Sequence, residues 1–228
     1  MNIELYEKHI TCPVCNKKFK TTKVKASRTR ILKTDTDFMV YYKSESPLIY
    51  DVVVCPECGF AALENKFSYF PNDKKHIVAD MITAKWKKKD YTNERTINDA
   101  LACYKLALYC AQTLKYKKFD LAGICMRIAW LNRLVEKKDE EKRFLMFACK
   151  LYEESYQGEN ISYDKIDENS LTYLIGELNR RLGNYKKAVE WFSKTASSSS
   201  IKTNPRIEKL TREQWMEAKA KYKEEQCV

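Results

Sequence analysis

The spacing of apolar residues changes along the chain and predicts two differently built regions. Residues 1–70 contain short β-branched and aromatic runs of the kind that form strands, separated by polar turns. From Thr96 onward the apolar residues recur every three to four positions, which is the period of an amphipathic α-helix. A short helix that begins near Pro71 and a polar run at 90–95 separate the two patterns. The predicted strands lie within 23–31, 38–42 and 48–54, the last two being separated by a turn at Pro47.

The helical region divides into several helices joined by short polar loops. Short loops between consecutive helices predict antiparallel neighbours. We expect loops at 158–162 and at 197–205, where polar and small residues replace the apolar stripe. The predicted helices cover 96–114, 121–135, 139–156, 167–182, 185–197 and 211–225.

The run 182–196 has a more specific pattern, that of the centre of a tetratricopeptide unit. Gly183 ends the first helix of the pair, and Ala188 lies where the second helix must approach it closely. Phe192 is expected to fill the groove to the next helix, with Gly176 as a small residue at the contact. The proline usual late in such a unit is absent. This pattern predicts at least one tetratricopeptide-like helical hairpin.

Composition restricts the class of protein. Hydrophobic residues make up 44% of 228 residues with only 5 Gly and 5 Pro, which favours a helical globular protein over a disordered or loop-rich one. No stretch approaches the roughly 20 apolar residues of a spanning helix, and the first ten residues lack the apolar core of a signal peptide. We therefore expect a cytoplasmic protein without a membrane partner, whose thiols stay reduced.

Four of the nine cysteines are spaced as metal ligands. Cys12-Pro-Val-Cys15 and Cys55-Pro-Glu-Cys58 form two C-P-x-C turns, separated by residues 16–54. Each turn places two thiolates on one side of an ion, and together they complete the tetrahedral shell of a structural zinc ion. Four thiolates leave no open position for a catalytic water. A thioredoxin-like redox role is disfavoured because neither turn lies in a βαβ pattern.

The other possible ligands have ordinary interpretations. His9 precedes the first turn and is an alternative ligand, but we expect it at the surface. Cysteines inside the predicted helices are expected to pack as small buried apolar residues. These are Cys103, Cys110, Cys125 and Cys149, whereas Cys227 is expected to be an exposed thiol near the C-terminus.

Basic residues are concentrated around the first cysteine pair. The chain has a formal charge of +11, and the segment from Lys8 to Lys33 contains nine Lys or Arg and no acid. One interpretation is a surface for nucleic-acid phosphates. The other is that these cations balance the formal charge of −2 that zinc with four thiolates carries. The cations that would contact phosphates are Lys17, Lys18, Lys20, Lys23, Lys25, Arg28 and Arg30.

Residues suited to catalysis are scarce. The chain has no P-loop, G-x-G-x-x-G, H-E-x-x-H or G-x-S-x-G motif and only two histidines. Asp35 and Asp37 either frame a small site with nearby tyrosines or form a polar turn before a strand, and the second is favoured. The tyrosines concerned are Tyr41, Tyr42 and Tyr50. We therefore expect that the protein is not an enzyme.

The order of several sequence blocks resembles a known family. These blocks are CPVC, DTDF, YYKSESPLIYDVVVCPECGFAA, RIAWLNR, YLIGELNRRLGNYKKAVEWFSK and REQW. Over about residues 5–217 the chain resembles the bacterial domain-of-unknown-function family 2225. The resemblance implies a zinc-ribbon-like start followed by tetratricopeptide-like helices, with metal ligands at Cys12, Cys15, Cys55 and Cys58. It implies no catalytic residues and no established activity.

These features predict a mainly α fold, with a small N-terminal four-cysteine zinc-ribbon-like β segment followed by a tetratricopeptide-like helical-hairpin domain. The predicted divisions are 1–70 for the ribbon, 71–95 for a connecting helix and linker, and 96–228 for the helices.

The leading hypothesis for function is a non-enzymatic protein-interaction scaffold with one structural Zn²⁺ and a groove for a protein or peptide. Cations in that groove would favour acidic ligands or C-terminal carboxylates. The alternatives are a nucleic-acid-binding accessory protein that uses the basic surface, and an enzyme with an unrecognised site. Trp130 is a candidate for the groove and, alternatively, for the core. The other groove candidates are Arg127, Asn132, Arg133, Asn179, Arg180 and Arg181.

Overall fold

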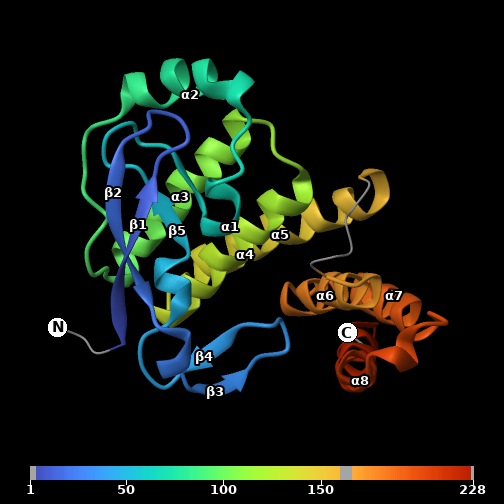
Figure 1. The fold of residues 1–228 in the computed structure, drawn as a ribbon. Coiled ribbons are helices and arrows are strands. Elements are labelled where there is room, and N and C mark those ends of the chain that lie inside the picture. Colours follow the sequence, from blue (N-terminus) through green and yellow to red (C-terminus); the bar gives the residue numbers. More distant parts are fainter. Residues whose placement is uncertain (1–3, 160–165, 227–228) are drawn as a thin grey trace.

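The computed structural model describes residues 4–159 and 166–226, and it is mainly α-helical (Figure 1). Within these ranges, short antiparallel strand pairs come first and eight α-helices follow. The strands are Leu5–Thr11 (β1), Lys18–Val24 (β2), Ile31–Thr34 (β3), Val40–Tyr42 (β4), Val52–Val54 (β5) and Ala61–Leu63 (β6). The helices are Glu64–Phe67 (α1), Lys75–Met81 (α2), Ile97–Thr113 (α3), Lys118–Leu134 (α4), Lys138–Gly158 (α5), Glu168–Arg181 (α6), Tyr185–Ala196 (α7) and Pro205–Gln226 (α8).

The strands form three separate β-hairpins. β1 pairs with β2 from Leu5↔Val24 to Thr11↔Lys18, and β5 pairs with β6 from Val52↔Leu63 to Val54↔Ala61. Each of these hairpins ends in one of the two C-P-x-C turns. The third hairpin, β3–β4, carries no cysteine and extends from the strand region towards α6 (Figure 1).

Two strands were not predicted, and one prediction was displaced. The predicted strand at 23–31 is instead the end of β2, a 3₁₀ turn at Ala26–Arg28 and the first residue of β3. β1 was missed because it is mostly exposed and charged, and β6 because alanine has low strand propensity. In both strands the pairing partner, and not intrinsic propensity, determines the structure.

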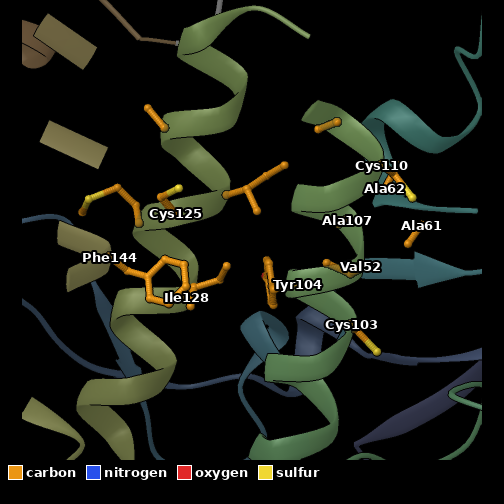
Figure 2. Packing of buried hydrophobic residues seen from close by; sticks show 14 of the residues in the cluster. Val52, Ala61, Ala62, Cys103, Tyr104, Ala107, Cys110, Cys125, Ile128 and Phe144 are labelled. Carbon is orange, nitrogen blue, oxygen red and sulfur yellow. The ribbon is translucent and has the colours of Figure 1, made fainter. Parts of the chain in front are cut away.

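The main hydrophobic core runs from the second C-P-x-C turn into the helices. α3 packs on β5 and β6 with one side and on α4 with the other, and Figure 2 shows Tyr104 between α3 and α4. Tyr104 is fully buried, and its hydroxyl donates to the Leu48 carbonyl at 3.0 Å. One cluster of buried residues extends from Cys12 to Leu178. The predicted divisions at 70 and 95 therefore do not lie between two separate hydrophobic cores, and the division of the chain into a ribbon, a connecting segment and a helical domain stays a prediction.

The predicted boundary at 90–95 is bonded to the strand region. Arg95 is buried, and its guanidinium donates to the carbonyls of Tyr91 at 2.8 Å and Val52 at 2.8 Å. The next residue, Thr96, begins α3 with a capping box that includes Asp99. The polar composition of this segment thus reflects a buried arginine and a helix cap and not a flexible linker.

The later helices form antiparallel pairs, α4 with α5 and α6 with α7, and α8 packs on α7. Gly183 ends the first helix of the second pair with φ +83°, a conformation that favours glycine. A Cβ on Gly176 would lie 2.8 Å from Phe192 Cδ1, so this glycine permits the close approach of α6 and α7 that the sequence predicted.

Three helix boundaries differ from the predictions by two residues or more, and one of them is the start of α4 at Lys118 instead of 121. α8 begins at Pro205 and not at 211, because proline fits the first turn of a helix and the Asn204 side chain accepts from the Ile207 amide at 3.3 Å. α5 continues to Gly158, and residues 160–162 of the loop predicted there lie outside the described residues, as does Cys227. In the part of the chain that the structure describes, no helix has the length and apolarity to span a membrane.

Candidate metal centre and acidic-turn site

The two C-P-x-C turns bring four cysteine sulfur atoms to one point. All four Sγ atoms lie within 4.8 Å of one another, with Cys12–Cys58 and Cys15–Cys55 both at 3.6 Å. Bonds of about 2.3 Å to a tetrahedral ion place sulfur atoms about 3.8 Å apart. Cys15 is exposed and the other three cysteines are buried. The residues therefore fit one metal ion, and none of these four cysteines is in a disulfide.

The two turns have nearly the same backbone structure. In the first knuckle, Cys12–Lys17, the Asn16 amide donates to the Cys12 carbonyl at 2.9 Å. In the second knuckle, Cys55–Phe60, the Gly59 amide donates to the Cys55 carbonyl at 3.0 Å. Asn16 and Gly59 both have positive φ, 59° and 74°, which these residue types tolerate best. The residue after each cysteine pair thus shapes the turn that presents the sulfurs.

A segment that sequence reasoning did not connect with the cysteines covers the second knuckle. Trp86 lies against Gly59 so closely that a Cβ there would be 2.6 Å from Trp86 Cδ2. The Trp86 indole donates to the Pro56 carbonyl at 3.1 Å, and the Thr83 hydroxyl donates to the Cys58 carbonyl at 2.9 Å. These contacts fix the knuckle from outside. The glycine after the motif was the only signal for them in the sequence.

Three of the four thiols, Cys12, Cys55 and Cys58, have strongly different acidities because they share hydrogen bonds. Bonds from Cys12 and Cys58 lower the pKa of Cys55, since they stabilise its thiolate. Bonding to Cys55 raises the pKa of Cys12, bonding to Cys12 and then to Cys55 raises the pKa of Cys58, and burial raises both further. Four adjacent thiolates repel one another, and a bound cation is what makes all four favourable.

The basic segment around the first knuckle is partly neutralised. Lys20 pairs with Glu7 at 2.7 Å, and the buried Lys23 pairs with Glu64 at 2.9 Å. Lys17 and Lys18 are exposed, and neither makes an ion pair with the described residues. Both interpretations of the segment therefore stay open.

The remaining candidate ligands lie away from the cluster. His9 is exposed on β1, opposite Lys20, and is not part of the cysteine group. The four cysteines inside helices are buried, as predicted, and burial raises their pKa values to about 11 or 12. Figure 2 shows three of them, Cys103, Cys110 and Cys125, among packed apolar side chains.

A second polar cluster forms where the β3–β4 hairpin meets the helices. The tip of this hairpin, Asp35–Phe38, is called the acidic turn below. The Asp37 carboxylate is completely buried, and it accepts from Arg133 Nη2 at 2.6 Å and from the Trp130 indole at 3.1 Å. Asp35 accepts from Arg133 at 3.0 Å and from Arg181 at 2.7 Å. The sequence predicted a polar turn here, but not that it is buried against α4 and α6.

The helices supply acids that hold these arginines. Glu177 is buried on α6 and accepts from Arg180 at 2.8 Å, from Arg181 at 2.7 Å and from the Thr36 hydroxyl at 2.5 Å. Glu141 accepts from Arg133 Nε at 2.6 Å. Each arginine therefore bonds both to a carboxylate of the helices and to another polar group, which fixes its orientation.

The electrostatic effect on the pKa of Asp35 has two opposing parts. Burial acts to raise the pKa of Asp35, but Arg181, a backbone hydrogen bond from Thr36 and Arg133 together outweigh it, so the pKa is lowered. Burial also disfavours the charged Arg133, but Asp37 and Glu141 raise its pKa overall. The cluster is thus an ion-pair network in which every described charge is compensated.

The last residue of the acidic turn is held in an unusual conformation. Phe38 has φ +70°, which is rare for a bulky residue. Its ring packs against Tyr173 with centroids 5.6 Å apart, and the Arg206 guanidinium lies 5.9 Å from the ring centroid. The Tyr173 hydroxyl donates to the Thr36 carbonyl at 2.8 Å. We call the side chains of Trp130, Arg133, Tyr173 and Arg181 the acidic-turn site.

The structure separates the seven groove candidates into two groups. Trp130, Arg133 and Arg181 contact the acidic turn, and Arg180 orients Glu177 behind it. The other three candidates make no hydrogen bond or ion pair with the acidic turn among the described residues. Asn132 and Asn179 are buried and bond to carbonyls of their own helices, while Arg127 Nε lies 3.5 Å from Asp51.

Among the described residues, the hydrogen-bond partners of Asp35 and Asp37 do not include the tyrosines expected beside them. Tyr50, for example, accepts from the Arg95 amide at 3.3 Å.

A cavity of about 220 Å³ borders Asp37 and Trp130, and its other walls include Phe119, Tyr152 and Lys66.

A mainly α-helical fold with a four-cysteine site able to hold a metal ion defines the class of protein. Over residues 5–218 the chain matches the model of a family described as uncharacterized proteins conserved in bacteria, DUF2225, and it belongs to that family. A protein of Borreliella burgdorferi strain B31 described as "Uncharacterized protein" is 26% identical over 156 residues, covering 59% of this chain and 55% of the relative. The match thus spans about half the length of that relative. No solved structure matches the chain.

Proposed function

We propose that this protein is a non-enzymatic interaction scaffold, in which one structural zinc ion holds the N-terminal hairpins and tetratricopeptide-like helix pairs present a binding face. The observation that carries the proposal is the convergence of four sulfur atoms from two knuckles whose backbones have the same shape. An all-thiolate tetrahedral set is typical of structural zinc, and it leaves no coordination position for a substrate.

The need for a metal follows from the exposure of the first hairpin. β5 and β6 are buried in the main core, but β1 is largely exposed, so apolar burial supplies little stability to the first knuckle. Structural zinc contributes roughly 10–16 kcal/mol in model peptides at neutral pH. That contribution is large enough to determine whether the knuckles fold.

Internal similarity supports a repeated helical unit. Leu-Asn-Arg occurs at 131–133 on α4 and at 178–180 on α6. In both copies the asparagine donates to the carbonyl four residues earlier, Asn132 to Ile128 at 2.8 Å and Asn179 to Ile175 at 3.0 Å. The copies are 179 − 132 = 47 residues apart, more than the usual 34 or so. The 21-residue α5 accounts for part of this difference.

The zinc part of the proposal is tested by elemental analysis of the purified chain, which should give one zinc per molecule. The scaffold part is tested by a photo-cross-linking residue at Met216, which is 74% exposed on α8. A matched probe at Tyr69, 83% exposed and far from the later helices in the sequence, is the control. We expect a discrete cross-linked protein in the source bacterium with the first probe only. Equal or absent cross-linking from both positions would contradict the proposal.

A second candidate function is nucleic-acid binding, which one surface feature favours. A concave surface with a volume of about 410 Å³ is lined by Arg28, Arg30 and Lys43, together with two serines and Glu4. Its test is a gel-shift series against salt concentration. Binding that falls steeply with salt, and is lost when these three cations are replaced by Gln, would support this function. Absence of binding at physiological salt would exclude it.

A further inference from the structure

The acidic turn occupies the helices in the way that a bound peptide would. Its contacts come from Trp130 and Arg133 on α4, Tyr173 and Arg181 on α6, and Arg206 on α8. These residues are distant from the turn in sequence, and they recognise three features. The features are two carboxylates, a backbone carbonyl and an aromatic ring.

The arginines are arranged in advance of any contact with the turn. Glu141 on α5 fixes Arg133 through Nε, and Glu177 on α6 fixes Arg181 through Nε. Both arginines therefore direct their outer nitrogens at the acidic turn while remaining bonded to the helices. A site whose donors are oriented by their own neighbours does not need one particular hairpin to shape it.

The hairpin that carries the turn is held mainly near its tip. β3 is exposed along its whole length, and Ile31 and Leu32 are 63% and 64% exposed, whereas β4 is half-buried. Asp37 at the tip is completely buried, and Met39 beside it is 1% exposed. Release of this end of the hairpin would free the acidic-turn site and would expose Met39.

We infer that the acidic-turn site is a recognition site for an extended Asp-x-Asp-aromatic segment of a partner protein, and that the chain's own acidic turn fills it in the absence of that partner. The inference rests on the proposed scaffold function and specifies its partner. Charge complementarity favours this occupant, because Arg133 and Arg181 would otherwise be left facing a partly buried surface without their carboxylates.

The test uses a fluorescent peptide with the sequence of residues 33–41, KTDTDFMVY, and measures its binding by fluorescence anisotropy. The host is a variant in which residues 34–40 are replaced by Asn-Gly, a two-residue turn that joins the paired Lys33 and Tyr41. A second host, Asp35→Asn with Asp37→Asn, keeps the length of the hairpin. Zinc content and the helical circular dichroism signal verify that each host is folded.

We expect the peptide to bind the hosts at least about ten-fold more tightly than the unaltered chain, in which the cis turn competes. Replacement of both aspartates in the peptide by Asn, or Arg181→Gln in the host, should weaken binding at least about thirty-fold. Arg212→Gln is the matched control, because Arg212 is exposed and pairs only with Glu208 among the described residues.

Two results would overturn the inference. One is a folded host that does not bind the peptide, or binds the Asn peptide equally well. The other is an unaltered chain that dimerises through exchanged hairpins, measured by light scattering, which would make a second copy the occupant. In either case cross-linking from Met216 would be unaffected, so failure of this inference is distinguishable from failure of the scaffold proposal.

Discussion

Two turns of this chain are held in place by different means. The knuckle at Cys55 is shaped by residues within one short motif and is covered by Thr83 and Trp86. Its sulfur atoms converge on one point with those of the first knuckle. The acidic turn is defined by ion pairs of Arg133 on α4 and Arg181 on α6 with Asp35 and Asp37, and by Arg206 on α8, which lies over the Phe38 ring. The comparison shows how a local motif and a dispersed set of residues can each hold a polar turn in place.

The difference also determines how the stability of each turn should respond to a substitution. Removal of one of four metal ligands weakens the binding of the ion that the other three share, so one substitution affects both knuckles. An ion-pair network loses one pair and leaves the remaining charges buried. Substitutions at the two turns distinguish these two responses.

Cys55→Ser should abolish stoichiometric zinc and remove a large share of the roughly 10–16 kcal/mol that a structural zinc site contributes. Elemental analysis and thermal unfolding measure the two effects. Cys103→Ala is the matched control, because Cys103 is a buried cysteine outside the cluster. It should retain the metal while losing only packing contacts. A Cys55→Ser protein with full zinc content would contradict the four-thiolate centre.

Arg133→Met should destabilise the fold by about 3–5 kcal/mol, because it leaves the buried carboxylate of Asp37 without its charged partner. Urea unfolding measures this change, and zinc content should not alter. Arg212→Met removes an exposed ion pair and should cost at most about 1 kcal/mol. Equal destabilisation by the two variants would mean that the ion-pair network contributes no more than a surface pair.

Gly176→Ala should cost about 1–3 kcal/mol, since the added Cβ would lie 2.8 Å from Phe192 Cδ1 and would separate α6 from α7. This variant tests whether the helix behind the acidic-turn site depends on close packing. In Gly158→Ala an added Cβ has no atom within 4 Å, so the change should be neutral or slightly stabilising. Thermal unfolding of both proteins provides the comparison.

The smallest expected effect concerns pH. The pKa of Asp35 is lowered in the folded state, so its contribution to stability is complete above the unfolded value of about 3.9. That contribution is lost as pH falls through the lower, folded value. Asp35→Asn should therefore reduce the loss of stability in this acidic range relative to the unaltered chain. Comparison of the two proteins at each pH cancels the protonation of the metal ligands that they share.

The sequence predicted the knuckles well because their information is local. Two cysteines at fixed spacing, a proline and a following Gly59 or Asn16 describe the backbone of each turn. The Thr83 and Trp86 contacts of the second knuckle come from outside the motif and were not predicted. The order and type of the later helices were also predicted correctly, since long amphipathic stripes are the strongest signal in a single sequence. The ends of helices with few apolar residues were not predicted correctly, as the early start of α8 at Pro205 shows.

The acidic-turn site could not be predicted for the opposite reason. Asp37 and Arg133 are 96 residues apart, and a charged residue in a polar turn is ordinarily exposed. Nothing within the run DTDF indicates that it inserts between helices. The sequence marks its arginines as groove candidates, but it indicates no partner for them within the chain. Only the three-dimensional path of the β3–β4 hairpin brings them together.

Each of the two turns has its own tryptophan. The Trp86 indole bonds to the carbonyl beside Cys55, and the Trp130 indole bonds to Asp37. The chain has four tryptophans, and indole emission depends on the polarity around the ring. The difference in emission between the unaltered chain and a Trp86→Phe protein would therefore report on the second knuckle, and the difference from a Trp130→Phe protein would report on the acidic turn. Chelator titration followed by fluorescence would then reveal whether the metal centre and the acidic turn open together or in sequence.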